Sequence, residues 1–178
     1  MTEKKKCEMA IDNCKYTFAE LAEKNFPQYM AGLRLSIKQS VPMSQFAVKG
    51  VGVATLLPQF DLPSDFSGCY VLLDGGVPNY VGISRTVFHR LRQHVLGTSH
   101  YDATFAYRIA FDRQPHKTTR SAAMANKDFS ATFLHARDDI RGMDVAFIKI
   151  KNPLELHVFE AFCAMELDTK KWNTFATH

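Results

Sequence analysis

The turn at residues 74–76 (Asp-Gly-Gly) separates two short β-prone runs, and no other feature of the chain constrains its fold as strongly. The runs are residues 69–73 and 77–83, both rich in β-branched, aromatic and aliphatic residues. Consecutive glycines adopt the positive φ angles that a two-residue hairpin turn requires. The sequence therefore predicts a β-hairpin. On paired antiparallel strands, Tyr70 and Tyr80 could face the same side of the sheet, although each tyrosine taken alone is typical of a packing residue.

Further elements follow the hairpin along the chain. In order, the sequence predicts a helix over 86–96 that Ser84 caps and Gly97 ends, a helix over 101–110, a long polar helical stretch over 118–141, a strand over 145–150 and a final helix over 153–167. Together with the hairpin, these elements predict an α/β fold of the α+β type. Its core is a small three-stranded sheet, mixed or antiparallel, flanked by helices.

The part of the chain before the hairpin has a different character. At 178 residues the chain can form one domain, or one domain with an extension. Residues 11–40 are predicted to be helical, with Pro27 breaking the run. Residues 41–67 are rich in Pro and Gly and are predicted to wrap around, or lead into, the main domain. We therefore expect a mostly helical extension and linker over 1–67 and a main domain over 68–178.

Several classes of protein are excluded by composition. The four cysteines include no CxxC pair and no His at zinc-ligand spacing, so reduced thiols are the simplest expectation. Charges near the N-terminus are not followed by an apolar run, which argues against a signal peptide. No window approaches 18 uncharged apolar residues, so we expect no membrane association. A cytoplasmic protein is the prediction that follows.

Positive charge is concentrated in one part of the chain. Residues 80–120 carry seven Lys or Arg and only two acids, Asp102 and Asp112, which gives a local net charge of +5. The rest of the chain has a net charge of −1. A basic region on a nearly neutral body fits a phosphate-binding face. A solvated helical surface explains the same charges, and composition alone leaves both interpretations open.

The helix predicted after the hairpin carries two polar residues of interest. Its apolar stripe consists of residues at helical spacing: Val87, Phe88, Leu91 and Val95. Arg90 and His94 are four residues apart, so they lie on one face, just beside that stripe. They could therefore reach a cleft beside the sheet. An ordinary amphipathic helix with arginines extending to solvent is the alternative.

The last predicted helix carries three glutamates with different surroundings. Asn152 and Pro153 fit the N-cap and first position, so Glu155 is expected to complete a capping box. Glu166 is expected to be solvated. Glu160 lies among apolar neighbours, where an unpaired carboxylate is costly, so it requires a partner or a metal. Mg²⁺ fits, because it often takes only one or two carboxylates and keeps several waters. A structural salt bridge is the alternative.

Taken in order, these residues resemble the motifs of the GIY-YIG nuclease family. The resemblance rests on Gly68-Cys69-Tyr70, Tyr80-Val81-Gly82, Arg90, His94, Glu160 and Asn173. Arg90 follows the second Tyr by ten residues, His94 follows Arg90 by four, and Asn173 follows Glu160 by thirteen. Cys69 and Val81 replace the usual isoleucines, and residues 112–141 form a helical insertion relative to a minimal family domain. Residues 1–67 match nothing in the family core.

The resemblance implies a divalent-metal-dependent DNA endonuclease, restriction-like or repair-like, that uses Mg²⁺ or Mn²⁺. By position, Glu160 binds the metal, Tyr70 is the general base and Arg90 stabilises the transition state. Tyr80 orients the water or phosphate, His94 hydrogen-bonds to Tyr70 or assists proton transfer, and Asn173 holds the geometry of the site.

Three further residues are candidate DNA contacts. Arg85 and Arg92 are expected to contact phosphates without reading the sequence. His100 could do the same, although a surface-loop histidine is the alternative. Two other functions remain open: a catalytically silent DNA-binding module on the same fold, and a small interaction protein without a nucleic-acid role. A homodimer is possible, but the sequence does not show one.

Overall fold

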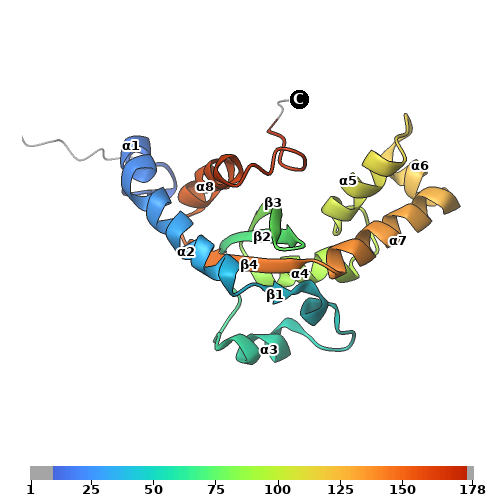
Figure 1. The fold of residues 1–178 in the computed structure, drawn as a ribbon, viewed down its shortest axis with the longest axis horizontal. Helices are drawn as coiled ribbons and strands as arrows, with labels where there is room; N and C mark the ends of the chain where they lie inside the picture. Colours follow the sequence, from blue (N-terminus) through green and yellow to red (C-terminus); the bar gives the residue numbers. More distant parts are fainter. Residues whose placement is uncertain (1–9, 176–178) are drawn as a thin grey trace, which may run out of the picture.

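An antiparallel sheet with strand order β1-β4-β2-β3 organises the chain in the computed structural model, which describes residues 10–175 (Figure 1). The strands are β1 (Val41–Pro42), β2 (Gly68–Asp74), β3 (Val77–Ser84) and β4 (Asp144–Lys149). The helices are α1 (Phe18–Glu20), α2 (Phe26–Lys38), α3 (Val53–Leu56), α4 (Val87–Leu96), α5 (Thr104–Arg113), α6 (Arg120–Ala125), α7 (Lys127–Arg141) and α8 (Pro153–Glu166). The α+β class is thus as expected, whereas the expected three-stranded sheet was wrong by one strand.

The additional strand is β1. Val41 pairs with Val145 and Pro42 with Asp144, which places β1 at one edge of the sheet. The N–H of Met43 continues this contact by donating to the carbonyl of Met143 at 2.9 Å. Two residues are too few to show the alternating pattern by which strands are recognised in a sequence. Residues 41–67 therefore do more than lead into the main domain, because they contribute an edge strand to its sheet.

The hairpin of β2 and β3 forms as predicted. Gly75 and Gly76 both have positive φ angles, 56° and 81°, as the tight turn requires. Tyr70 pairs with Gly82 and Leu72 with Tyr80. Because alternate residues of a strand share a face, this register places Tyr70 and Tyr80 on the same side of the sheet.

Each face of the sheet has its own apolar core. Tyr70 and Leu72 belong to a core formed with residues of α4, α5 and α7. Cys69 and Val71, which alternate with them, pack on the opposite face with residues of α2 and α8. Figure 1 shows α2 and α8 to the left of the sheet and α5, α6 and α7 to its right. β3 is the edge strand against which α8 also packs.

The first turn of α4 is capped by a residue that the sequence did not indicate. Ser84 was expected to cap this helix, but its hydroxyl is hydrogen-bonded within the preceding turn, to the backbone of Thr86. The Asp65 carboxylate instead accepts the N–H groups of Phe88 (2.9 Å) and His89 (3.0 Å). A carboxylate there satisfies free donors and interacts favourably with the helix dipole. Asp65 lies before the hairpin, 23 and 24 residues from the N–H groups it accepts, so it does not stand at the N-cap position that a sequence pattern would reveal.

Other helices differ from expectation in ways that have local causes. Pro27 does not break the first helical region, because it occupies the start of α2 after the π-helical turn Leu21–Asn25. The π-helical turn directly before α2 departs from the regular i→i−4 hydrogen bonding, and the helical run continues through the proline. The stretch over 118–141 divides at Asn126, whose side chain accepts two N–H groups at the start of α7.

Only half of the predicted capping box of α8 is present. The Asn152 side chain accepts the N–H of Glu155 at 3.0 Å. The Glu155 carboxylate does not return to the cap but is buried, and it accepts the hydroxyl of Tyr29 at 2.6 Å. This bond joins α2 to α8 across 126 residues of sequence.

The cysteines of the described residues, Cys14, Cys69 and Cys163, are all free and buried, in line with the reduced thiols expected. Cys7 and the N-terminal charges lie outside the described residues. Within residues 10–175, no helix combines the length and the hydropathy needed to cross a membrane.

Candidate active site

Two tyrosines from neighbouring strands form the centre of the site. Tyr70 on β2 is 1% exposed, and its ring centroid lies 6.4 Å from that of Tyr80 on β3. Gly82 lies opposite Tyr70, and a Cβ at that position would overlap the Tyr70 hydroxyl. Tyr80 stacks on Phe105 of α5, with ring centroids 4.3 Å apart and planes within 15°. The hairpin thus holds two phenols together, and Gly82 leaves the space that one of them occupies.

His94 on α4 is the hydrogen-bond partner of Tyr70. Its Nε2 lies 2.7 Å from the Tyr70 hydroxyl, and the imidazole is fully buried. Burial, assisted by the positive charge of Arg90, lowers the pKa of His94 to about 3, so the ring is neutral at pH 7. Burial also raises the pKa of Tyr70 well above its ordinary value, and Tyr80 adds to this effect. A protonated phenol beside a neutral imidazole assigns the donor role to Tyr70 and the acceptor role to His94 Nε2.

Arg90 is held beside the two phenols by the segment that follows α4. Its Nη1 donates to the carbonyl of Asp102 and its Nη2 to the hydroxyl of Thr104, each at 2.7 Å. It forms no ion pair with a carboxylate of residues 10–175, so its charge is not neutralised locally. That charge opposes the effect of burial on both Tyr70 and Tyr80 and lowers their pKa values. Arg90 is thus a fixed, uncompensated cation at the site.

Glu160 on α8 contributes the negative charge. Its negative charge adds to the effect of burial, which is the main reason that the pKa values of Tyr70 and Tyr80 are raised. Glu160 itself is half-buried, and burial raises its pKa while His157 lowers it. In the described part of the chain it has no hydrogen bond and no salt bridge, unlike Glu155 and Glu166. The structural salt bridge considered for Glu160 is therefore not formed.

The surroundings of Glu160 can be compared with two kinds of metal site: one made entirely of protein ligands, and one in which water supplies most of the ligands. A half-buried carboxylate without a partner is costly unless a cation compensates it. No group of three or more His, Cys, Asp or Glu in residues 10–175 is arranged to hold a metal. Mg²⁺ does not require such a group, since it often takes one carboxylate and completes its octahedron with water. Within the described residues, Glu160 is thus the one carboxylate of the site, and a single carboxylate is compatible with a largely hydrated Mg²⁺ or Mn²⁺.

Asn173 connects the C-terminal segment to the edge of the sheet. Its side chain accepts the N–H of Val81 at 2.9 Å and donates to the carbonyl of Val81 at 2.8 Å. Val81 lies between Tyr80 and Gly82, so this pair of bonds fixes the backbone that carries both. The neighbouring Trp172 is buried against Phe105 in an edge-to-face contact of 5.5 Å. Asn173 thus acts on the site through the backbone, as a positioning residue.

The three expected DNA contacts have different surroundings. Arg85 is exposed at the end of β3, where it is available to a ligand. Arg92 donates to the carbonyls of Phe46 and Val48, so its guanidinium anchors the segment after β1. His100 was weighed as a phosphate contact or a surface-loop residue, but it is only 7% exposed and packs 4.1 Å from the ring of Tyr101. The surface-loop interpretation was wrong, because the turn before α5 folds the imidazole inward.

Two residues of the site carried no recognisable signal in the sequence. Phe105 supports Tyr80, and Thr104 holds Arg90, yet both appear in the sequence only as ordinary residues of an amphipathic helix. They lie in a helix whose orientation toward β3 is set by tertiary packing. Gly82, by contrast, is part of the motif itself.

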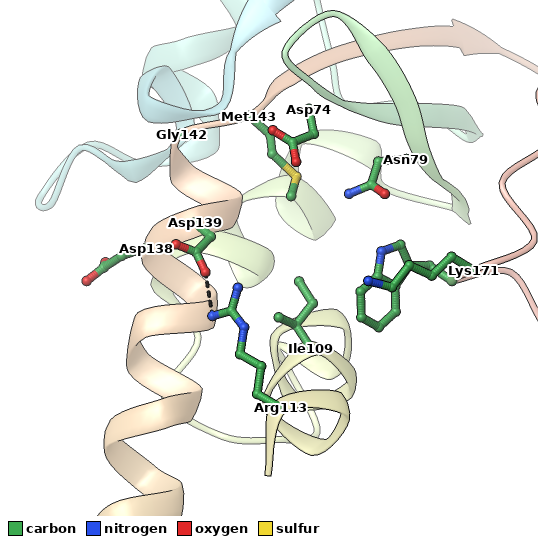
Figure 2. A pocket seen from close by; sticks show the side chains of 10 residues that line it. Asp74, Asn79, Ile109, Arg113, Asp138, Asp139, Gly142, Met143 and Lys171 are labelled. Carbon is green, nitrogen blue, oxygen red and sulfur yellow. Dashed lines mark ion pairs between the residues drawn. The ribbon is translucent and has the colours of Figure 1, made fainter. Parts of the chain in front are cut away.

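Two surface hollows lie on either side of the C-terminal segment, whose Lys171 and Trp172 line both. The first, of about 590 Å³, lies between the hairpin tip, α5 and the end of α7 (Figure 2). Asp74, Asp138 and Asp139 line it, and Asp139 pairs with Arg113 at 2.6 Å. The second, of about 610 Å³, lies between α5, the start of α6 and residues 171–174. Neither Tyr70 nor Tyr80 lines either hollow, so neither hollow coincides with the candidate active site.

No protein-family model, curated protein or solved structure matches the chain.

Proposed function

We propose that this chain is a divalent-metal-dependent DNA endonuclease that hydrolyses phosphodiester bonds, with a GIY-YIG-type site. The observation that carries the proposal is that Tyr70 and Tyr80 lie together, with ring centroids 6.4 Å apart, beside the fixed charge of Arg90. The charge of Glu160, which has no hydrogen bond or salt bridge within residues 10–175, also acts on both phenols. The proposal is supported by contacts among residues of the family motif that come from different elements: Tyr70 of β2 bonds to His94 of α4, and Asn173 bonds to the backbone of β3 beside Tyr80. The basic region over residues 80–120 supports DNA as the substrate.

Each side chain has a role in hydrolysis that follows from its position. Glu160 would hold the divalent cation, which when bound would supply a Lewis acid for the phosphoryl oxygen. The pKa of Tyr70 is raised mainly by burial and to a smaller extent by the charge of Glu160, and a cation at Glu160 would offset that smaller effect. For Tyr70 to act as the base, its phenol would first release its own proton to solvent, because His94 does not hold it. The phenolate would then take a proton from the attacking water, and the positive charge of Arg90 favours that ionised form against the effect of burial. Arg90 also stabilises negative charge on the phosphoryl oxygens in the transition state.

The other residues position these groups. Neutral His94 fixes the orientation of the Tyr70 hydroxyl, and its low pKa makes it a poor store for a second proton. Tyr80, clamped on Phe105, orients the water or the phosphate. Asn173 maintains the edge strand on which Tyr80 lies. None of these side chains recognises a base, so the proposal extends to the reaction and leaves DNA sequence specificity to other surfaces.

Nicking of supercoiled plasmid tests the proposal. We expect cleavage that requires Mg²⁺ or Mn²⁺ and stops with EDTA, and losses of at least about 100-fold in Glu160→Ala and Arg90→Ala. Glu166→Ala is the matched control, because Glu166 lies on the same helix but is exposed and paired with Arg34. Near wild-type rates in Glu160→Ala would remove the assignment, and DNA binding without any cleavage would favour a silent binding module. Sequencing the cut ends from random duplex and branched DNA distinguishes a restriction-like from a repair-like enzyme.

A further inference from the structure

The hollow between α5, α6 and the C-terminal segment is lined mainly by cations and aromatic rings. Arg108, Arg120 and Lys171 line it together with one acid, Asp112. The hollow of Figure 2 differs in charge, because three aspartates offset its two basic residues there. In the hollow beside α6, Lys171 is paired with Asp112 at 3.7 Å, so Arg108 and Arg120 supply its excess positive charge. That excess favours a phosphate there over the hollow of Figure 2.

The two arginines of the hollow beside α6 have donors to spare. Arg108 uses Nη2 for one neutral bond, to the hydroxyl of Thr174 at 3.0 Å. Arg120 lies over the ring of Tyr107, 5.2 Å from its centroid. Neither arginine has an acidic partner within the described chain. Both guanidinium groups therefore remain able to bind an anion, and their planar donors suit phosphate oxygens.

An exposed aromatic surface lies beside these cations. Phe111 is 42% exposed, and its ring stands perpendicular to His116 at 5.0 Å. His116 is fixed in turn, because its Nε2 lies 2.8 Å from the Tyr107 hydroxyl. A flat apolar ring next to spare cations matches the two parts of a nucleotide, since bases stack on aromatic side chains while phosphates pair with arginine.

The hollow is adjacent to the candidate active site. Arg108 lies one turn after Phe105, the residue on which Tyr80 stacks, and its charge acts on Tyr80. Thr174, which accepts from Arg108, follows Asn173, the residue that holds the backbone beside Tyr80. The hollow and the candidate active site therefore border the same parts of α5 and of the C-terminal segment, which would let one DNA strand contact both.

We propose that this hollow binds one unpaired nucleotide of the DNA substrate, with the base on Phe111 and a phosphate between Arg108 and Arg120. The inference rests on the proposed nuclease function and makes its substrate more specific. Unstacking a base is least costly where it is mismatched, bulged or already single-stranded. The expected preference is therefore for DNA with an unpaired nucleotide near the cut.

The test is a binding measurement on the full chain in EDTA, where no cleavage occurs. The probes are a fluorescein-labelled duplex of about 20 base pairs (roughly 70 Å long) and the same duplex with one bulged nucleotide. We expect tighter binding of the bulged probe, and a loss of about ten-fold for that probe alone in Phe111→Ala. Leu134→Ala is the matched control, since Leu134 has the same 42% exposure and lies outside the hollow. Arg120→Ala should reduce the slope of log affinity against log salt by about 0.7 to 0.9, and Lys127→Ala should leave it unchanged.

The outcomes separate this inference from the nuclease proposal. The inference is overturned if Phe111→Ala weakens binding of both probes equally or of neither probe. It is also overturned if the wild-type chain binds neither probe. These results count against it whatever the plasmid assay shows. Displacement of the bulged probe by a free 5′-mononucleotide of equal affinity also overturns it, by assigning the hollow to free nucleotides. Phe111-dependent binding of the bulged probe in a chain that never cleaves DNA overturns the nuclease proposal and leaves the nucleotide site in place.

Discussion

The Tyr70 hydroxyl and His94 Nε2 lie 2.7 Å apart inside the protein, and their pKa values are displaced in opposite directions by burial. Tyr70→Phe removes the hydroxyl and leaves the ring in place. Because Tyr70 is the proposed base, we expect plasmid nicking to fall by about 100- to 10,000-fold while the fold is retained. Circular dichroism and the nicking rate, measured on the same preparation, check this. A folded Tyr70→Phe variant that nicks at the wild-type rate would assign the base to another group.

His94 should make stability depend on acid pH. Its pKa is about 3 in the folded chain and about 6.5 when unfolded, so the unfolded state binds one more proton between these values. The free energy of unfolding should therefore fall as pH decreases below about 6.5, by up to about 1.4 kcal/mol per pH unit. His94→Gln should flatten this slope, whereas His135→Gln, at an exposed site on α7, should retain it. Urea unfolding from pH 7 to pH 4 measures both, and parallel slopes in all three proteins would contradict the prediction.

Gly82 should be essential for cleavage although it carries no functional group. In Gly82→Ala the new methyl group meets the ring carbon and hydroxyl of Tyr70, which must then move. We expect destabilisation of about 1–3 kcal/mol and a loss of nicking of about 100-fold. Gly32→Ala is the control, because no atom lies within 4 Å of its new methyl group and a helical alanine stabilises by up to about 1 kcal/mol. If both variants keep full activity, the packing of Tyr70 on Gly82 is not required.

The Tyr29 to Glu155 bond should contribute to stability rather than to activity. Tyr29→Phe keeps the ring against Phe159 but removes the hydroxyl that the buried Glu155 carboxylate accepts. Among residues 10–175, the carboxylate then retains only a long contact with the Cys14 thiol, at 4.0 Å. We expect a loss of about 1–3 kcal/mol in the free energy of unfolding with an unchanged nicking rate. Tyr101→Phe, at a position 72% exposed, should have no such effect.

Local chemistry made part of the fold predictable. The hairpin was predicted because two consecutive glycines specify its turn, and they adopt the expected positive φ angles. The apolar stripe of α4 was predicted because its four apolar residues recur at the spacing of one helix face, and all four are fully buried. The hydrogen bond between Tyr70 and His94 was one of two roles that the resemblance to the GIY-YIG family implied for His94, and the bond is present.

Features that depend on tertiary contacts were not predictable in this way. The Asp65 cap and the β1 pairing join segments whose separation in sequence bears no relation to the bonds they form. Glu155 was expected at a cap because its spacing from Asn152 is correct, yet a hydroxyl from α2 competes for its carboxylate. The inward orientation of His100 depends on the path of the loop before α5, which no periodicity describes.

The cap on α4 sets a boundary for any fragment designed to carry the proposed active site. A fragment that begins at Gly68 contains every motif residue but loses the Asp65 carboxylate, the Phe66 carbonyl that accepts the N–H of Val87, and the strand that covers the outer edge of β4. Arg90 and His94 lie on the helix whose first turn would then be left open to water. The smallest fragment that keeps the fold of this site should therefore begin before Val41, upstream of the first recognisable motif at Gly68.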